Sequence, residues 1–379
     1  MYKVEIDGQT LYHPNLQQYS IENAILTLEV NKAGLFKFTI RQNHPLYSEI
    51  KIMESRITVY DDEEILFIGR VLSTKRGFYN EKQVTCEGEL AFLLDTIIRP
   101  YDFAGSVGEY FSWIITKHRQ NSSGEKGVFY PGSCTVTNNN NNISRSNTNY
   151  PNTFDELREK LLEPLGGYLS LRHEDGVTYI DYLQDFESEN EQVIKFGENL
   201  IDLEDVIKGQ DIATVLIPLG AYLKDENGND TSERLTLEHT SEIGAVEYVL
   251  NSDAKKKFGR IEKVVVFEDV TTVEDLKEKA EEELEKSLNF LNNLKLTAID
   301  LHLLNQDIEK FRTESYVIVQ SKAHGLDTRL LVRKMELNLT NKADGTIEIG
   351  EENKTLSSVM AKRTIMDKLV RKYKGVWNY

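Results

Sequence analysis

Cysteine, tryptophan and long apolar runs are all scarce in this sequence of 379 residues. Cys86 and Cys134 are its only cysteines, too few for a disulfide framework or a cysteine-rich zinc site, so we predict two free thiols. No run approaches the length of about 18 apolar residues that a membrane helix needs. The first eight residues lack the basic and apolar segments of a secretory signal. We therefore predict neither a disulfide-stapled domain nor a membrane span.

Basic residues are also in deficit, with 45 Lys and Arg against 62 Asp and Glu and a formal net charge of −17. Proteins that bind DNA or RNA gain affinity by neutralising phosphates with Lys and Arg. We therefore predict no sequence-specific nucleic-acid partner, and an anionic membrane surface is disfavoured for the same reason. Hydrophobic residues make up 40% of the chain, which is ordinary for globular proteins, and its length predicts roughly two to four domains.

Familiar catalytic motifs are absent as well. The sequence has no Gly-x-Gly-x-x-Gly, phosphate loop or His-Glu-x-x-His, and Ala104 stands where a nucleophile elbow around Ser106 needs glycine. A nucleophilic cysteine needs a rigidly placed base, but Cys86 falls in a predicted strand as a core thiol and Cys134 in an Asn-rich loop. We predict no catalytic, cofactor-binding or metal-ligating residue, no cofactor and no enzymatic activity.

Two acidic clusters are interpreted as turns. The triplet His173-Glu174-Asp175 resembles a metal-binding group, but it occupies a predicted hairpin turn before Gly176, where acidic residues serve the backbone. The acidic segment 61–64 is interpreted as a solvated turn between two strands. Paired carboxylates for glycoside hydrolysis stay open, because any acidic protein supplies many such pairs.

The first quarter of the chain alternates apolar and polar residues in short runs, which is typical of antiparallel strands with one buried face. The predicted elements are two hairpins, one further strand and a short helix: 26–30 with 36–40, 57–60 with 65–68, 83–87, and 90–95. Many short strands at this spacing favour a small barrel or sandwich. We predict that residues 1–98 form a first antiparallel β-barrel.

Residues 99–195 change character and predict a small α+β domain. Capping boxes that begin at Ser106 and Thr153 open two helices, and the glycines at 166–167 end the second one. The stretch 121–152 is rich in Ser, Asn and Gly, so it is predicted to be a long surface loop.

The second half of the chain predicts a discontinuous second β-barrel. Strands within 196–222 and 312–353 need partners, and the economical solution pairs these segments with each other. Residues 223–311 are then an inserted α+β domain, since insertions are tolerated at surface turns. Its helix begins with a capping box at Thr271 and packs one face against a sheet, with a partner helix as the alternative. Residues 354–379 are a predicted C-terminal helix and tail.

The predicted fold class is therefore α+β and mainly β, with two antiparallel β-barrel-like domains and two small α+β domains. One strand, within 214–221, contains Pro218. Because proline cannot donate a ladder hydrogen bond, this strand is predicted to take an edge position there.

The order of several short segments resembles the prophage tail endopeptidase family, also called tail-associated lysins, and more broadly the baseplate hub proteins of phages. The segments that carry the resemblance are Thr153–Leu157, Leu165–Leu169, Tyr179–Leu183, Phe196–Leu203, Ile217–Ala221, Tyr248-Val249, Phe258–Phe267, His324–Asp327 and Thr346–Gly350. The resemblance runs from about residue 100 to 355, and the N-terminal β region is compatible with it.

This resemblance implies a structural hub of a phage tail tip or baseplate, found in the virion and assembled in the host cytoplasm. Family hubs are homotrimers in which two similar barrels per subunit make a six-barrel ring around a channel for DNA. The implied partners are the distal tail protein, the tape-measure protein and a tail fibre or receptor-binding protein. In longer members the hydrolase lies beyond the hub, so no catalytic residue is carried over to this chain.

Two alternatives belong to other functional classes. A cell-wall-degrading endopeptidase would hide its activity within 99–195 or 223–311. A carbohydrate-binding module for cell-wall polymers would be supported by clustered exposed tryptophans, but the chain has only Trp113 and Trp377. Release of fragments from peptidoglycan separates the enzyme from the hub.

Overall fold

The computed structural model of the protein describes residues 1–122, 127–138, 141–206, 212–225, 230–239, 246–267, 270–289, 293–303, 305 and 307–350. Strands dominate and most of them are antiparallel, which confirms the predicted mainly β class. The chain divides into a larger unit, Met1–Leu203 with Lys295–Tyr379, and a smaller unit, Glu204–Leu294. The domain boundaries drawn from the sequence stay a prediction, and the helix expected within 354–379 lies outside the described residues.

A first strand group opens the larger unit. Its strands are β1 (Tyr2–Ile6), β2 (Gln9–Tyr12), β3 (Glu22–Glu29), β4 (Leu35–Ile40), β5 (Arg56–Asp61), β6 (Glu64–Arg76) and β7 (Lys82–Gly88). They lie in the order β3-β4-β7-β6-β5-β1-β2, with antiparallel neighbours throughout. The period-two pattern explains the core, because Phe36, Phe38, Ile57 and Val59 all point into it. Cys86 lies in the same core, as predicted.

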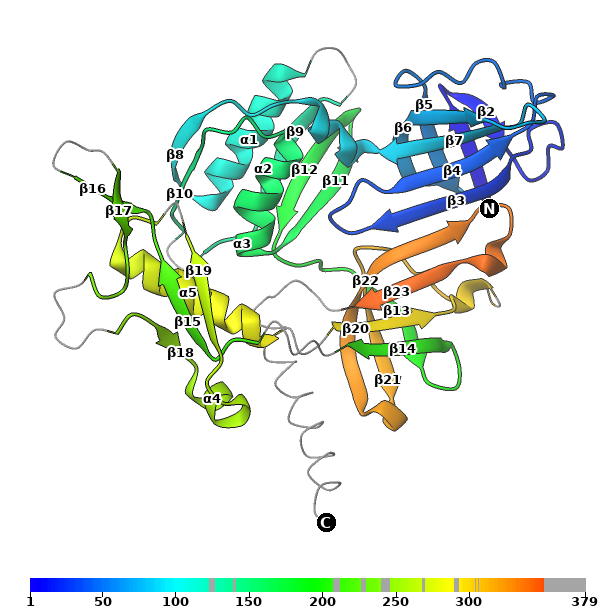
Figure 1. Ribbon diagram of the computed structural model, residues 1–379. Coiled ribbons are helices and arrows are strands. Elements are labelled where there is room, and N and C mark those ends of the chain that lie inside the picture. The colour runs from blue at the N-terminus through cyan, green and yellow to red at the C-terminus, as the bar shows by residue number, and fades with distance from the viewer. Residues whose placement is uncertain are drawn as a thin grey trace. The chain divides into compact units, whose positions relative to one another are not determined.

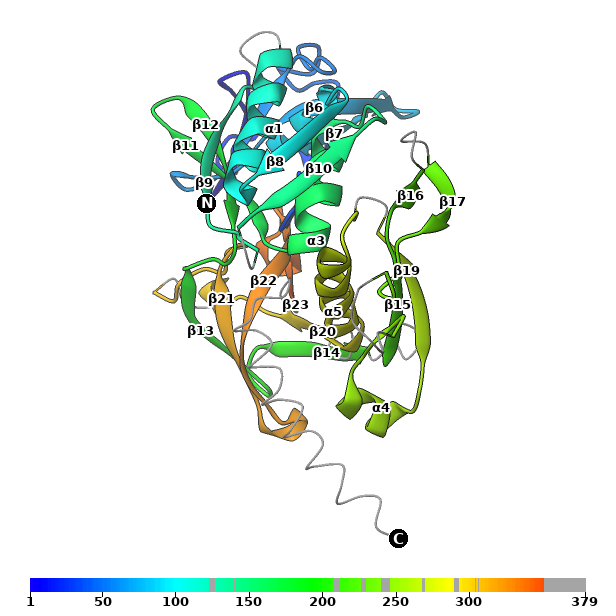
Figure 2. The same ribbon diagram turned by 90° about the vertical axis from the view of Figure 1, so that its left-hand side faces the viewer.

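A second strand group forms the last part of the larger unit along the chain. Its elements are β13 (Glu189–Lys195), β14 (Leu200–Val206), β20 (Asn293–Ala298), β21 (Tyr316–Ser321), β22 (Leu326–Asn338) and β23 (Thr346–Gly350), with short 3₁₀ turns at Leu301–Leu303, Lys322–His324 and Lys342–Asp344. The strands lie in the order β14-β20-β23-β22-β21-β13. Figure 2 shows β21 and β22 as a long hairpin with β13 alongside β21.

The two groups repeat one arrangement. In chain order and in sheet position, β1, β3, β4, β5, β6 and β7 correspond to β13, β14, β20, β21, β22 and β23. The central strands β6 and β22 are each 13 residues long, and each shifts register against the following strand, at Leu72 and at Arg333. The first pair differs, since β1 runs antiparallel to β5 and β13 runs parallel to β21.

A matching backbone hydrogen bond supports this correspondence. The residue before each register shift donates its N–H to the carbonyl of a buried serine that directly precedes the hairpin. Val71 donates to Ser55 at 3.1 Å, and Val332 donates to Ser315 at 2.9 Å. The repeat therefore extends from strand order to individual hydrogen bonds.

The two groups join into one sheet. The end of β22 pairs with β3, so the path runs without a break from β14 to β2 in a 13-stranded sheet. Figure 1 shows β22 and β3 side by side. No closed barrel is detected among the described strands, so the barrel part of the fold prediction is not confirmed. The physical reason is that β3, the edge strand of the first group, pairs with β22 of the second group.

A small α+β region follows the first group and precedes the second along the chain. Its elements are the 3₁₀ helix η1 (Glu89–Asp95), β8 (Tyr101–Gly105), α1 (Val107–Asn121), β9 (Phe129–Cys134), β10 (Ile143–Asn147), α2 (Thr153–Leu157), a π-helical turn (Arg158–Leu162), α3 (Glu163–Leu165), β11 (Tyr168–Glu174) and β12 (Val177–Leu183). The capping box at Ser106 is confirmed, with reciprocal hydrogen bonds to Glu109. At α2 the cap is Asn152 instead of Thr153, because Asn152 Oδ1 accepts from the Asp155 N–H at 2.8 Å.

The prediction of one long loop over 121–152 is wrong. Strand β9 runs parallel to β12, and β10 pairs with β8. The proline and glycine at 131–132 explain why β9 was not predicted, because both residues are poor strand formers. Pairing with β12 holds this segment extended. Cys134 therefore ends a strand, half-buried, and does not lie in a loop.

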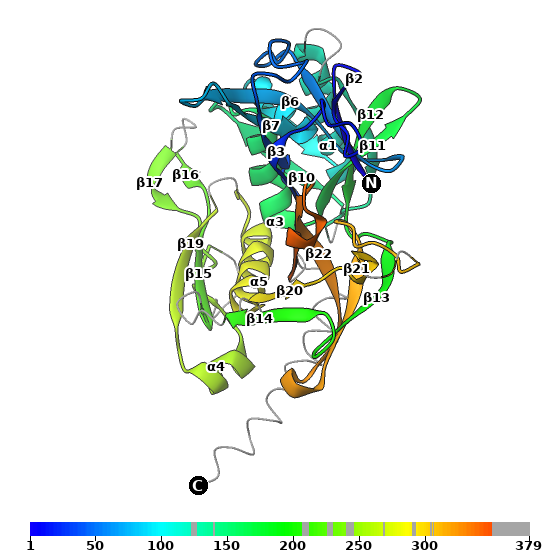
Figure 3. The same ribbon diagram turned by 90° about the vertical axis from the view of Figure 1, so that its right-hand side faces the viewer.

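The smaller unit has its own sheet and core. Its elements are β15 (Val215–Leu219), β16 (Tyr222–Lys224), β17 (Asp230–Arg234), β18 (Val249–Leu250), α4 (Ser252–Phe258), β19 (Glu262–Val266) and α5 (Val273–Asn289). Helix α5 lies against the β18-β15-β19 sheet (Figure 3), and Leu276, Ala280 and Leu284 share a core with Leu216. Packing of this helix on a sheet is thus confirmed, although Thr272 caps it in place of Thr271.

Strand β15 has different partners from those expected. Its predicted partners were strands of 312–353, whereas it pairs with β18 and, in parallel, with β19. The pattern of one strand cannot choose between distant partners. The two-residue β18 reaches only Val215 and Leu216, so in the described chain Pro218 has a strand neighbour on the β19 side alone.

Candidate functional site

The backbone junction between the two strand groups is the first part of the candidate site. Residues Lys334–Asn338 of β22 pair antiparallel with Ile25–Glu29 of β3. The next residue, Leu339, is 3% exposed and belongs to the core of the first group. Its N–H donates to the carbonyl of Ala24 at 2.8 Å, and its own carbonyl accepts from the Tyr12 hydroxyl at 3.3 Å. The junction thus combines strand pairing with an apolar side chain inserted into the neighbouring core.

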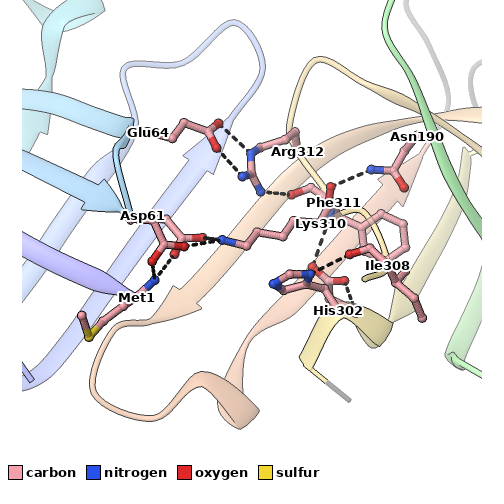
Figure 4. A network of polar contacts seen from close by, with 11 residues as sticks. Met1, Asp61, Glu64, Asn190, His302, Ile308, Lys310, Phe311 and Arg312 are labelled. Carbon is pink, nitrogen blue, oxygen red and sulfur yellow. Dashed lines mark hydrogen bonds and ion pairs between the residues drawn. The ribbon is translucent and has the colours of Figure 1, made fainter. Parts of the chain in front are cut away.

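A charged cluster reinforces the same junction (Figure 4). Lys310 Nζ donates to Asp61 and, at 3.3 Å, to Asp62 in the turn between β5 and β6. The amine of Met1 also donates to Asp61, at 2.8 Å. Burial alone raises the pKa of the Asp61 carboxyl, but the hydrogen bonds from Lys310 and the Met1 amine hold it below its usual range. Asp61 is therefore ionised and paired across the junction.

A second ion pair lies beside the first. Arg312 donates to both carboxylate oxygens of Glu64, through Nε at 2.7 Å and through its terminal nitrogen. Burial opposes the charge on Arg312, yet the hydrogen bond to Glu64 raises its pKa above the ordinary value. A two-point arginine–carboxylate contact fixes orientation as well as distance.

Polar contacts within the second group hold the segment that carries these cations. Asp300 accepts from the N–H of Phe311 at 3.1 Å and from the side-chain amide of Gln192 at 2.6 Å. Asn190 donates to the carbonyl of Lys310 at 2.6 Å, and a ring nitrogen of His302 contacts the Ile308 carbonyl at 2.6 Å. The backbone around Lys310 is thus held by its own strand group as well as by the first.

A cavity of about 880 Å³ lies next to the two ion pairs. Among its lining residues is Glu314, whose Oε2 accepts from the Ser170 hydroxyl at 2.7 Å. Burial raises the pKa of the Glu314 carboxyl above its usual range. Glu314 also has a φ of 66°, which is uncommon for a residue other than glycine. Its described hydrogen-bond partner is a serine hydroxyl, which is neither a base nor a second carboxyl.

The candidate residues singled out from the sequence lie elsewhere. The hairpin turn at 173–176 is confirmed, with Asp175 and Gly176 at φ values of 49° and 77° between β11 and β12. His173 lies at the end of β11, and its Nε2 is 2.6 Å from a carboxylate oxygen of Glu89. Within the described residues no group of three His, Cys, Asp or Glu is placed to bind a metal ion.

The prediction of a solvated turn at 61–64 is wrong for Asp61. Asp62 is exposed, but Asp61 is buried because Lys310 reaches it from a segment 249 residues away. Nothing local in the sequence marks Lys310 or Arg312 as partners of this turn. The alternation that buries Ile57 and Val59 does extend to Asp61, and this was the available signal.

Two groups of 99–195 that hydrolysis could use, His118 and Glu156, are buried and hydrogen-bonded. One ring nitrogen of His118 contacts the Thr96 hydroxyl at 2.6 Å and the other contacts the Gly127 carbonyl at 2.9 Å, while burial lowers the pKa of the imidazole. Glu156 is fully buried and accepts hydrogen bonds from Tyr101 and Tyr110. These residues support packing of the α+β region.

Comparison with known proteins shows what the chain resembles. Residues 188–360 match the family model described as prophage endopeptidase tail, which confirms the resemblance drawn from the sequence. The matched region holds β13, β14, β20 to β23 and the smaller unit. Over these residues the chain is therefore similar to the prophage tail family.

Three solved structures share the fold at low identity. The 43 kDa tail protein of prophage MuSo2 from Shewanella oneidensis is 14% identical with a TM-score of 0.59, covering 92% of this chain and 97% of that one. The tail protein from Neisseria meningitidis MC58 is 14% identical with a TM-score of 0.62, covering 92% and 96%. Prophage tail protein gp18 from Listeria monocytogenes EGD-e is 13% identical with a TM-score of 0.56, covering 97% and 99%. A search of curated proteins found no match. Among the described helices, none has the length and apolar character needed to cross a membrane.

Proposed function

We propose that this protein is a structural hub of the phage tail tip, and that three copies form a ring with a central channel for DNA. The observation that carries this proposal is the repeat of the two strand groups. One chain supplies two similar groups, so three chains place six of them around an axis. Such a ring offers pseudo-sixfold contacts to a sixfold tail, with the distal tail protein and tape-measure protein on one side and fibre components on the other.

The charge of the chain fits passage of DNA. A net charge of −17 gives an acidic protein, and an acidic channel wall would repel phosphates and keep DNA from adhering. The paired charges at the junction serve rigidity, since Asp61 and Glu64 both have cationic partners. A channel wall found to be strongly basic in an assembled ring would overturn this part of the proposal.

Mass in solution tests the ring. Light scattering of purified protein is expected to give three times the chain mass of 43.5 kDa, and electron microscopy to show six-lobed particles. A second arm adds the distal tail protein, which is expected to promote the trimer if the chain alone is dilute or monomeric. Failure to form a trimer with or without that partner would contradict the proposal.

The same protein tests the enzymatic alternative, which the family description keeps open. Incubation with host peptidoglycan is expected to release neither peptides nor muropeptides. If peptides or muropeptides are released and the release disappears in a Glu314→Gln variant, the hydrolase is assigned to the cavity of about 880 Å³. Glu314 is a carboxyl that lines this cavity and has a raised pKa.

A further inference from the structure

The end of strand β6 corresponds to the part of β22 that pairs with β3, but it has no such partner strand in the described part of the chain. Beyond its register shift, β22 pairs with β3 on one side and β23 on the other. Beyond the shift at Leu72, β6 pairs with β7, while its pairing with β5 ends at Arg70. In the described part of the chain, no strand pairs with residues 72–76 on the side that β3 occupies in the second group.

The hairpin tip after β6 is also uncovered. Phe78 stands six residues beyond Leu72, as Leu339 stands six residues beyond Arg333. Leu339 is 3% exposed because it enters the core of the neighbouring strand group, whereas Phe78 is 91% exposed and Tyr79 next to it 84%. Two adjacent, almost fully exposed aromatic rings in the turn after β6 are of the residue types that are enriched in protein–protein interfaces.

Strand β14 is the matching free edge. Its counterpart β3 has β4 on one side and β22 on the other. Strand β14 pairs with β20 and ends the sheet path among the described strands. Its Ile201 is 57% exposed, and Asp202 beside it is exposed too. An exposed apolar edge strand is a template for pairing with another chain.

We infer that residues 72–76 of β6 pair with β14 of a second copy of this chain, and that Phe78 enters the second strand group of that copy. The inference rests on the proposed ring and specifies its contact between subunits. Exposed Lys75 and Arg76 on β6 face a strand that carries Asp202, so the charges are complementary. Junctions within and between chains then alternate, and three repeats of the same contact close the ring.

Cross-linking between two variants tests the pairing. Arg76→Cys and Ile201→Cys are made in separate chains that also carry Cys134→Ser, because antiparallel pairing as in the β22–β3 junction brings the end of the β6 stretch to the start of β14. Cys86 stays, because it is fully buried and burial raises the pKa of its thiol. A short bismaleimide is expected to give a covalent dimer, twice 43.5 kDa, from the equimolar mixture and none from either variant alone. No mixed dimer, in a preparation that still forms trimers, would overturn the pairing and leave the ring standing.

Substitution at the tip gives an independent readout. Phe78→Asp is expected to weaken self-association roughly tenfold or more, since a few buried aromatic anchors carry most of the binding free energy of an interface. Tyr150→Asp, at an aromatic residue that is 59% exposed, serves as the matched control and should change nothing. Equal trimer content in both variants would refute the role of Phe78. If the parent protein forms no trimer and the cysteine variants form no mixed dimer, both with the distal tail protein present, the pairing and the ring are overturned together.

Discussion

The two strand groups of the larger unit share a backbone plan but differ in what covers them. Both have a 13-residue central strand, a register shift and a buried serine bonded to the residue before it. The second group inserts its hairpin tip into the first, while the tip of the first stays exposed. The comparison teaches that the two repeats keep the same backbone hydrogen bonds, whereas the burial of corresponding side chains depends on which element packs against each repeat.

The hairpin tips give the largest expected contrast. Leu339→Asp places a carboxylate in the core of the first group, so we expect a loss of at least about 4 kcal/mol in the free energy of unfolding. Phe78→Asp changes the corresponding exposed position, and a loss within about 0.5 kcal/mol is expected for the isolated chain. Urea unfolding of both variants measures the contrast. Similar losses would break the correspondence between the two tips.

Corresponding core positions give the next contrast. Phe36 and Leu296 are both fully buried and face Cys86 and Ile349, which occupy matching places in β7 and β23. Phe36→Ala is expected to reduce the free energy of unfolding by about 3–5 kcal/mol, because Phe36 also stacks on Phe38. Leu296→Ala should cost less, about 2–3 kcal/mol. Thermal and urea unfolding check the order, and the reverse order would show that the second group holds the tighter core.

The charged cluster tests how firmly the groups are joined. Lys310→Met leaves the buried Asp61 with only the Met1 amine, and a loss of roughly 2–3 kcal/mol is expected at pH 7. The pKa of Asp61 is lowered in the folded state, so its stabilisation is present at neutral pH and is lost as the pH falls below about 4. The difference between variant and parent should therefore shrink in acid.

Arg312→Gln is the matched control for Lys310. Its partner Glu64 is half exposed, so a loss of no more than about 1 kcal/mol is expected. Unfolding curves at pH 7 and at acidic pH distinguish the two variants. A larger loss from Arg312 than from Lys310, or a Lys310 effect that persists in acid, would contradict the role given to Asp61.

The smallest expected effect is a gain. Burial raises the pKa of Glu314, so ionisation destabilises the folded state, and parent stability falls as the pH rises through that raised pKa. Glu314→Gln removes the charge while keeping side-chain length and the same φ strain, so we expect a gain of roughly 1 kcal/mol at pH 7. The gain should vanish in acid, where the carboxyl of the parent is protonated. A loss at pH 7 would mean that the carboxylate is stabilised by its bond with Ser170.

Local sequence patterns by themselves determined several features of the protein. Alternation located the two N-terminal hairpins and the core position of Cys86, and helical spacing located the buried face of α5. The capping box at Ser106 and the turn at Asp175-Gly176 follow from short-range backbone chemistry. The ordered segments also indicated a resemblance to the prophage tail family, which the match over 188–360 confirms.

Tertiary structure alone decided which strands meet. The pattern of a strand specifies its buried face but not the strand that pairs with its edge, and for this reason the partners of β15 were predicted wrongly. Strand β9 was not predicted because it contains proline and glycine. Lys310 reaches Asp61 across 249 residues, a contact that no local pattern encodes. The joining of β22 to β3 into one sheet has the same origin, because edge pairing depends on backbone groups that every sequence shares.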